Sequence, residues 1–368
     1  MYWIEWMIWY LQTSPSEREN WERVHKKYTT EKRSGKFSHE KELPGIRESV
    51  SNTPCADGSV YECNEVYVEV MAGESSERRG VVTYFSVFLS YLLCNLAVDL
   101  VADNKVILSA LYSGRAVTGG DYASAAFVAI LTAATFYVVF RYGRILINLE
   151  NFVQRRMLIR FNRVTRQVYL HRPKFAGGIT VLDWEEVTVD PAVADKNEGD
   201  NVGRKLILFW EPSLPDRPHL HLVFVGKRAD GTSDIVNLWE FIRRYMEEGP
   251  QSVPAPKKLL GKVPWPWLSV MASLSFFRPL WRAGLRWQVA CIVALASPGL
   301  AFHSVGHWIS LLLCWEPRWP RIIREAGLPG KPVPPLSTAA DWPPLPTVET
   351  AGKKPGCIEQ GIQHEETK

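Results

Sequence analysis

Two pairs of histidines have the residue type and the spacing that come closest to a metal site. His219 and His221 lie two residues apart in a strand-like run, so both side chains project from one face and could form half of a metal site. His303 and His307 lie four residues apart in an apolar segment, which places both on one helical face. Neither pair has a third ligand nearby, and no HExxH glutamate accompanies the second. We therefore predict no metal and no cofactor, with the first pair on a strand face and the second pore-facing or bonded to the backbone.

A group of four carboxylates is the remaining candidate for an active site. The four are Asp183, Glu185, Glu186 and Asp190. They would share acid–base chemistry only if the fold brought them together, and alternating exposed acids on two strands explain them more simply. No serine lies in a GxSxG elbow, and the sequence has no P-loop, GxGxxG or CxxC motif. The sequence therefore favours a protein that is not an enzyme.

An arginine-rich run follows the second of two long apolar stretches. We predict that six of its members contact lipid headgroups: Arg141, Arg144, Arg155, Arg156, Arg160 and Arg163. Phe161 and Tyr169 are interleaved with them, as in nucleic-acid-binding surfaces, but the net charge of the chain is only +4. Each juxtamembrane Lys or Arg gains on the order of 1 kcal/mol against anionic headgroups. Lipid contact is therefore a sufficient explanation, and we expect no nucleic-acid partner.

The two long apolar stretches indicate a membrane protein. Residues 81–101 contain one charge, Asp99, and residues 122–140 contain none. A bilayer core is crossed by about 20 apolar helical residues, and neither stretch has the polar face typical of a buried core helix. We therefore predict a transmembrane hairpin over residues 81–142. The mean hydropathy of −0.11 over 368 residues excludes a chain that lies in the membrane throughout.

The distribution of basic residues sets the orientation of this hairpin. Arg78 and Arg79 precede the first span and the arginine-rich run follows the second, whereas the link carries only Lys105 and Arg115. Cytoplasmic loops carry the excess of Lys and Arg. We therefore expect both ends of the hairpin in the cytoplasm, together with a largely polar region, residues 1–80, that lacks a secretory signal.

Short alternating runs between Met157 and Gly249 predict a small antiparallel β domain. Turn residues separate six strand-like runs, MLIRFN, RQVYLH, GITVLDW, EEVTVD, KLILFWE and HLHLVFVG. A helix capped by Asp234 and ended by Gly249 and Pro250 follows them. This order is typical of a pleckstrin-homology-like sandwich over residues 150–250, closed by its C-terminal helix. Its core is expected to contain three tryptophans, Trp184, Trp210 and Trp239.

These elements together predict an α+β membrane protein. A six-stranded barrel with an unrelated topology is the alternative to the sandwich, because its strands would have the same pattern. One further strand-like run, Glu65–Val70, precedes the first apolar stretch.

The region 251–327 contains another apolar segment, residues 287–315, without Lys, Arg, Asp or Glu. As a single third span kinked at Pro298–Gly299, it would place one of its two flanking arginine clusters outside, against the charge rule. A turn at Pro298–Gly299 instead gives two pieces that suit a re-entrant or interfacial pair, which we favour. Residues 328–368 are rich in proline and predict a disordered tail.

Several runs resemble known families. FNRVTRQVYLHRP and GGITVLDWEEV, after a two-helix hairpin, resemble membrane-tethered bacterial pleckstrin-homology-like proteins. The further run CWEPRWPRIIREAG is similar to one Gram-negative family that carries only a domain-of-unknown-function label. The resemblance covers roughly residues 60–328 and implies a multi-pass protein of the bacterial inner membrane. Members are often encoded near type VI secretion effectors, and the family provides no functional residues to carry over.

Two functional hypotheses follow. The first is a non-enzymatic inner-membrane protein whose cytoplasmic β domain binds a protein partner, a secretion effector or accessory, as an immunity or effector-accessory protein. The second is a lipid-responsive scaffold or sensor that binds anionic lipid through the arginine-rich segment. A transporter is disfavoured, because two or three spans provide little pathway.

Overall fold

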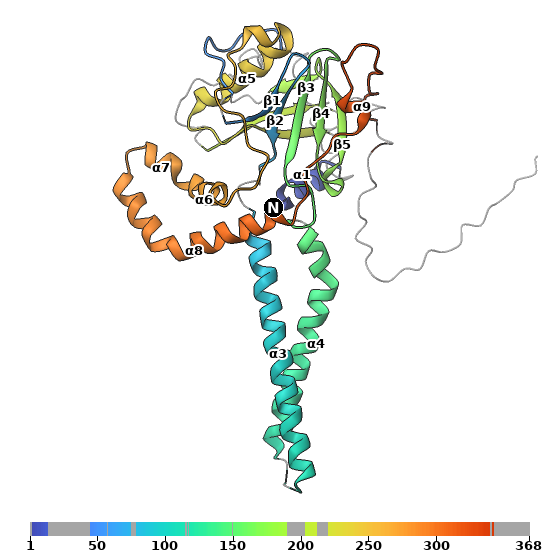
Figure 1. Ribbon diagram of the computed structural model, residues 1–368, viewed down its shortest axis with the longest axis vertical. Coiled ribbons are helices and arrows are strands. Elements are labelled where there is room, and N and C mark those ends of the chain that lie inside the picture. Colours follow the sequence, from blue (N-terminus) through green and yellow to red (C-terminus); the bar gives the residue numbers. More distant parts are fainter. Residues whose placement is uncertain are drawn as a thin grey trace, which may run out of the picture.

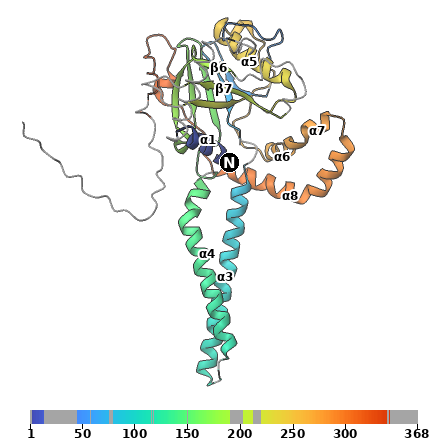
Figure 2. The ribbon, with the colours of Figure 1, turned by 180° about the vertical axis from the view of Figure 1, so that it is seen from behind.

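The computed structural model is a mixed α+β protein in which helices project from an antiparallel sheet (Figure 1). It describes residues 2–13, 45–56, 58–74, 79–114, 116, 118–148, 150–189, 203–211, 220–338 and 341. Two long helices, α3 (Val81–Tyr112) and α4 (Gly119–Asn148), lie side by side and extend away from the sheet. A third long helix, α8 (Arg286–Leu312), runs crosswise to them where they meet the sheet (Figures 1 and 2).

Eight strands form one antiparallel sheet. They are β1 (Val60–Cys63), β2 (Tyr67–Ala72), β3 (Met157–Asn162), β4 (Gln167–His171), β5 (Ile179–Asp183), β6 (Val187–Val189), β7 (Leu206–Trp210) and β8 (His221–Val225). The strand order is β5-β4-β3-β2-β8-β7-β6, and β1 pairs with β2. All six strands predicted between residues 157 and 225 are present. Strands β6, β7 and β8 alternate buried and half-buried residues, whereas β3 and β4 are buried on both faces.

The sheet begins earlier in the chain than the predicted β domain. The run predicted at Glu65–Val70 is strand β2, which pairs with β3 from Tyr67–Asn162 to Ala72–Met157. Helices α3 and α4 are therefore inserted between two neighbouring strands of one sheet. The boundary at residue 150 was wrong because strand pairing joins segments on both sides of the long insertion.

The core lies between the curved sheet and helix α5 (Thr232–Glu247). Trp184, Trp210 and Trp239 are fully buried there, as predicted. The predicted cap of α5 was wrong. Gly231 is the N-cap residue without a side-chain cap, while the Asp234 carboxylate accepts a hydrogen bond of 3.0 Å from the Asp230 amide.

Helix α5 holds the segment before β1 through a buried carboxylate, Glu240. This carboxylate accepts hydrogen bonds from Arg243 (2.8 Å), Arg244 (2.6 Å), the Ser49 hydroxyl (2.7 Å) and the Val50 amide (3.0 Å). Burial alone would raise the pKa of Glu240, but these hydrogen bonds lower the pKa to about 2.

This carboxylate makes part of the stability dependent on pH. A carboxylate whose pKa is lower in the folded state stabilises the fold at pH values above its unfolded pKa. For Glu240 this contribution is complete above pH 4.5 and is lost as the pH falls through about 2. We expect the free energy of unfolding to fall across this window, and Glu240→Gln to lower stability at neutral pH and flatten the acid dependence. Denaturant unfolding at a series of pH values tests this, with the exposed Glu65→Gln as the matched control. Equal acid profiles for Glu240→Gln and the unaltered protein would refute it.

Helices α3 and α4 expose their apolar side chains. The stretches Val81–Ala102 and Gly119–Gly143 are long and apolar enough to cross a membrane, and only 17% and 0% of their most apolar windows are buried. The apolar stretches predicted at 81–101 and 122–140 lie within these two helices.

The described residues after α5 form four more helices. They are α6 (Pro266–Leu274), α7 (Arg278–Arg282), α8 and α9 (Arg321–Arg324), with short 3₁₀ turns at Pro250–Ser252 and Ser275–Phe277. The turn predicted at Pro298–Gly299 was wrong, because α8 continues through Pro298. A proline inside a helix loses one backbone hydrogen bond, whereas a broken helix would leave several polar groups unpaired among apolar side chains.

The first part of the predicted disordered tail lies along the sheet. The Gln167 amide donates to the carbonyl of Pro334 (2.9 Å). Val181 on the edge strand β5 exchanges two hydrogen bonds of 2.9 Å with Ser337. The prediction of a tail beginning at residue 328 was therefore wrong for residues up to 338. Its remainder, apart from Asp341, lies outside the described residues.

Candidate functional site at the joint between the sheet and the apolar helices

The start of α3, the end of α4 and the end of α8 meet beside the sheet around two buried charged residues. Arg79 precedes α3 and is 1% exposed, and Glu150 follows α4 and is 0% exposed. The turn after α8 joins them, since Trp315 exchanges backbone hydrogen bonds with Val153 (3.2 Å) and Arg155 (2.7 Å). This joint, defined by Arg79 and Glu150 with their partners, connects the sheet to all three long apolar helices.

Glu150 binds the N-terminus of α3. Its carboxylate accepts hydrogen bonds from the Gly80 amide, the Val82 amide (3.1 Å) and the Thr83 amide (3.4 Å). The Thr83 hydroxyl donates to it as well (2.8 Å). The first amides of a helix have no partner within the helix and carry the positive end of its dipole. Glu150, which follows the end of α4, therefore caps the N-terminus of α3.

Arg79 connects the same point to α8 and to the start of the chain. Its guanidinium donates to the backbone carbonyls of Glu150 (2.5 Å) and Arg155, to the Ser310 hydroxyl (3.3 Å) and to the Cys314 thiol (2.8 Å). It also lies over the Tyr2 ring, 5.1 Å from the centroid. One buried cation thus has partners in three segments that are distant in sequence: the start of the chain, residues 150–155 and residues 310–314.

Helix α8 crosses the start of α3 at a contact between two glycines. A Cβ atom on Gly306 would lie 2.8 Å from the backbone oxygen of Gly80, and a Cβ on Gly80 would lie 2.4 Å from the backbone nitrogen of His307. Gly80 has a φ of +104°, which disfavours any side chain. Only glycine allows the two backbones to approach this closely.

The predicted histidine pair anchors α8 to α6. His303 and His307 do share one helical face, with ring centroids 6.2 Å apart. Nδ1 of His303 bonds the Ser273 hydroxyl (2.7 Å), and Nδ1 of His307 bonds the Ser269 hydroxyl (2.8 Å), so these two ring nitrogens bond side chains of α6 and not the backbone. Serine hydroxyls are available because an α-helix already occupies its interior carbonyls.

Most of the predicted headgroup arginines have partners inside the protein. Arg155 and Arg156 form ion pairs with Glu316 (3.5 and 2.9 Å). Arg160 pairs with Glu69 (2.8 Å), and both side chains are almost fully buried. A guanidinium buried in this way does not reach a headgroup, which corrects the prediction for Arg156 and Arg160.

The remaining members of that set differ in exposure. Arg163 donates to the backbone carbonyl of Glu65 (3.3 Å). Arg141 lies exposed on α4, with its guanidinium over the Tyr142 ring. The side chain of Arg144 lies outside the described residues. Headgroup contact by Arg141 therefore stays a prediction.

The other candidates for chemistry do not assemble. His221 is buried against the Trp9 ring, and His219 lies outside the described residues. Glu185 pairs with Arg166, Asp183 accepts a local hydrogen bond from the Glu185 amide, and Asp190 lies outside the described residues. Within the described part of the chain, no three His, Cys, Asp or Glu side chains are placed to hold a metal ion.

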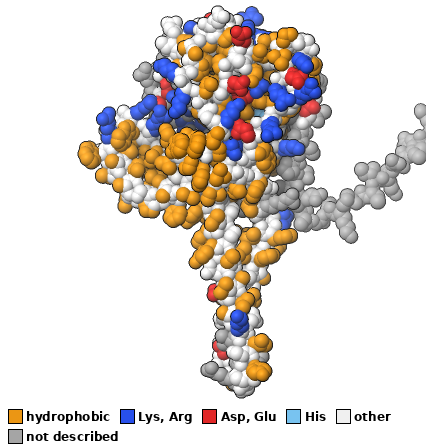
Figure 3. All heavy atoms as spheres, viewed as in Figure 1, with side chains coloured by type: hydrophobic (Ala, Val, Ile, Leu, Met, Phe, Trp, Pro, Cys, Tyr) orange, Lys and Arg blue, Asp and Glu red, His pale blue; other side chains and the backbone are white. Residues whose placement is uncertain are grey.

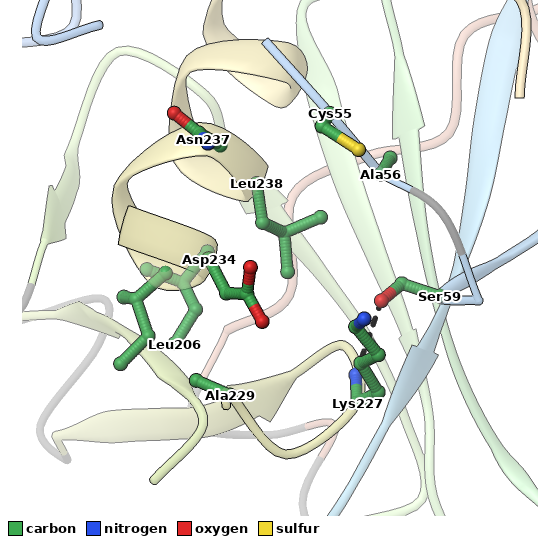
Figure 4. A pocket seen from close by; sticks show the side chains of 10 residues that line it. Cys55, Ala56, Ser59, Leu206, Lys227, Ala229, Asp234, Asn237 and Leu238 are labelled. Atoms are coloured by element: carbon green, nitrogen blue, oxygen red, sulfur yellow. Dashed lines mark hydrogen bonds between the residues drawn. The ribbon is translucent and has the colours of Figure 1, made fainter. Parts of the chain in front are cut away.

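A small hollow lies between α5 and the segment before β1 (Figure 4). The side chains of Cys55, Ser59, Asp234 and Leu238 line it, and the Ser59 hydroxyl accepts a hydrogen bond of 3.1 Å from the Lys227 amide. Its volume is about 30 Å³, which is the space of about one water molecule. The hollow is therefore too small for a substrate.

From the sequence, Arg79 was assigned only to the orientation of the hairpin, and Glu150 was assigned no role. The usable signal was position: each is a charged residue directly beside an apolar stretch, Arg79 before the first and Glu150 after the second. Opposite charges at the two ends of one antiparallel helix pair predict a contact at their shared base.

The fold and the joint define a class: an antiparallel sheet of eight strands that carries three apolar helices, each long enough to cross a membrane. The match to a family model over residues 136–328, more than half of the chain, then identifies the family. The chain belongs to the family of unknown function DUF6708. This confirms the resemblance to a family with a domain-of-unknown-function label. No curated protein and no solved structure matches the chain.

Proposed function

We propose that the protein is anchored in a membrane by α3 and α4 as a hairpin and presents its sheet domain in the cytoplasm. The observation that carries this proposal is the exposed apolar surface of two helices inserted between adjacent strands. Figure 3 shows hydrophobic side chains along both helices, and only 17% and 0% of their most apolar windows are buried. Such a surface requires lipid or protein around it, because water would make it an aggregation site.

We propose a pleckstrin-homology-like fold for the sheet domain, and the order of its strands supports this proposal. Strands β2–β5 form one meander, β6–β8 form a second, and α5 packs against the core they enclose. We propose that this domain binds a protein partner and is not an enzyme. The resemblance noted from sequence favours the inner membrane of Gram-negative bacteria and a partner from type VI secretion, as an immunity or effector-accessory protein.

Labelling of single cysteines tests the membrane anchor and its orientation. Cys94 lies exposed midway along α3, Cys55 lies exposed in the sheet domain, and Ser113→Cys would mark the link between the long helices. In intact cells we expect a membrane-impermeant maleimide to label only Ser113→Cys. After the cells are broken, Cys55 should react and Cys94 should stay protected, because a thiolate does not form in hydrocarbon. Rapid labelling of Cys94 would contradict the hairpin, and protection of Ser113→Cys in intact cells would contradict the orientation.

The partner is tested by purifying the tagged full-length protein from its host in mild detergent and identifying bound proteins. Recovery of a neighbouring effector in near-equal amount supports the protein-binding role, and rescue of growth against that effector distinguishes immunity from loading. Recovery of phospholipid without a stoichiometric protein would refute this role in favour of a lipid-responsive scaffold.

A further inference from the structure

Residues of helices α6, α7 and α8 line an open apolar groove. Its volume is about 510 Å³, within the range of about 300–1,000 Å³ typical of ligand pockets. Met271, Leu274 and Phe277 line one wall, and Val289 and Val293 on α8 line the other. The groove is therefore large enough for a ligand, unlike the small hollow beside α5.

The rim of this groove is basic. Arg278 and Arg282 on α7 line it, and their side chains are 54% and 53% exposed. Their acidic partner is Asp230 of the sheet domain, at 3.9 Å from Arg278 and 2.5 Å from Arg282. Because a guanidinium has five N–H donors, both arginines keep donors for an anion. The charged rim thus faces the sheet domain.

The outer surface of the same three helices is apolar and rich in tryptophan. Exposed members include Trp265, Trp267, Phe276 and Trp287, and the exposed Trp281 also lines the groove. Figure 3 shows a broad hydrophobic area over this part of the molecule, continuous with the upper part of α3 and α4. Tryptophan is enriched where membranes meet water. The crossing of α8 over the start of α3 places this surface at the level where the proposed hairpin would enter a bilayer.

We propose that the groove between α6–α7 and α8 binds one anionic phospholipid, with an acyl chain along the apolar walls and the phosphate against Arg278 and Arg282. This inference rests on the proposed membrane anchor. A basic rim that contacts the sheet domain, next to apolar walls, matches the headgroup and the acyl chain of a phospholipid. A soluble anion would use the rim alone and leave the apolar walls unfilled.

The test is native mass spectrometry of the full-length protein in a nonionic detergent, titrated with phosphatidylglycerol or with phosphatidylcholine of the same acyl chains. We expect one phosphatidylglycerol to bind and phosphatidylcholine to bind more weakly. The double variant Arg278→Gln/Arg282→Gln should weaken phosphatidylglycerol binding by about 30-fold, at the usual contribution of a membrane-surface arginine. Arg286→Gln, outside the groove lining, is the matched control and should bind as the unaltered protein does.

A second pair of variants tests the apolar walls. Val293→Phe fills the groove, whereas Leu295→Phe on the same helix adds its ring to a side chain that is 87% exposed. Loss of phosphatidylglycerol binding in the first and retention in the second support the proposal. Equal binding by these two variants, equal affinity for both lipids, or an equal loss in Arg286→Gln would overturn it. Failure of the unaltered protein to resist alkaline extraction from membranes would instead refute the anchor.

Discussion

Replacing Glu150 by alanine will lower the free energy of unfolding by about 3–5 kcal/mol, because several buried donors lose one shared acceptor and each unsatisfied donor costs about 1–3 kcal/mol. Three backbone amides at the start of α3 and the Thr83 hydroxyl would lose their shared acceptor in a site without access to water. The hydrogen bond from Arg79 to the backbone carbonyl of residue 150 does not depend on the side chain, so the loss is confined to the start of α3. Glu150→Gln keeps one acceptor oxygen and should fall between alanine and the unaltered protein.

Tryptophan fluorescence of the purified protein during denaturant unfolding in detergent measures this loss, since Trp184, Trp210 and Trp239 report on the sheet core. Glu185→Ala is the matched control. Its carboxylate pairs with Arg166 at the surface, where such a pair contributes about 0–1 kcal/mol. If Glu150→Ala unfolds at the same denaturant concentration as Glu185→Ala, the joint does not stabilise the fold.

The sequence predicted local elements well and their assembly less well. The six strands between residues 157 and 225 were recognised because alternation is a local signal. Their union with β1 and β2 was missed, because strand pairing depends on which edges meet and not on spacing along the chain. The insertion of α3 and α4 between β2 and β3 follows only from that pairing.

The candidate site shows the same limit at the level of single residues. A juxtamembrane arginine and a buried ion pair use the same residue type, so the sequence did not distinguish Arg160 paired with Glu69 from a headgroup contact. Proline followed by glycine favoured a turn in α8, but the surrounding helix outweighed that local preference. The hydroxyl partners of His303 and His307 come from another helix, which no spacing within α8 reveals.

Disrupting the glycine contact between α8 and α3 is predicted to cause the second large loss of stability. Gly306→Ala should separate the two helices, because its Cβ would lie 2.8 Å from a backbone oxygen that has no rotamer by which to move away. Overpacking of this kind costs about 1–3 kcal/mol of stability. A shift of α8 should also weaken the joint, because Ser310 and Cys314 at the end of α8 bind Arg79. We expect a lower unfolding midpoint and faster proteolysis in residues 253–265, the connection between α5 and α6.

Gly299→Ala provides a control with the same substitution in the same helix. Nothing lies within 4 Å of a Cβ at Gly299, so alanine there should stabilise α8 by up to about 1 kcal/mol through its helix propensity. The two substitutions are therefore predicted to change stability in opposite directions. Equal effects would show that the position of α8 across α3 does not depend on the glycine contact. The lipid groove, which depends on α8 being held against α6 and α7, should then be insensitive to Gly306→Ala as well.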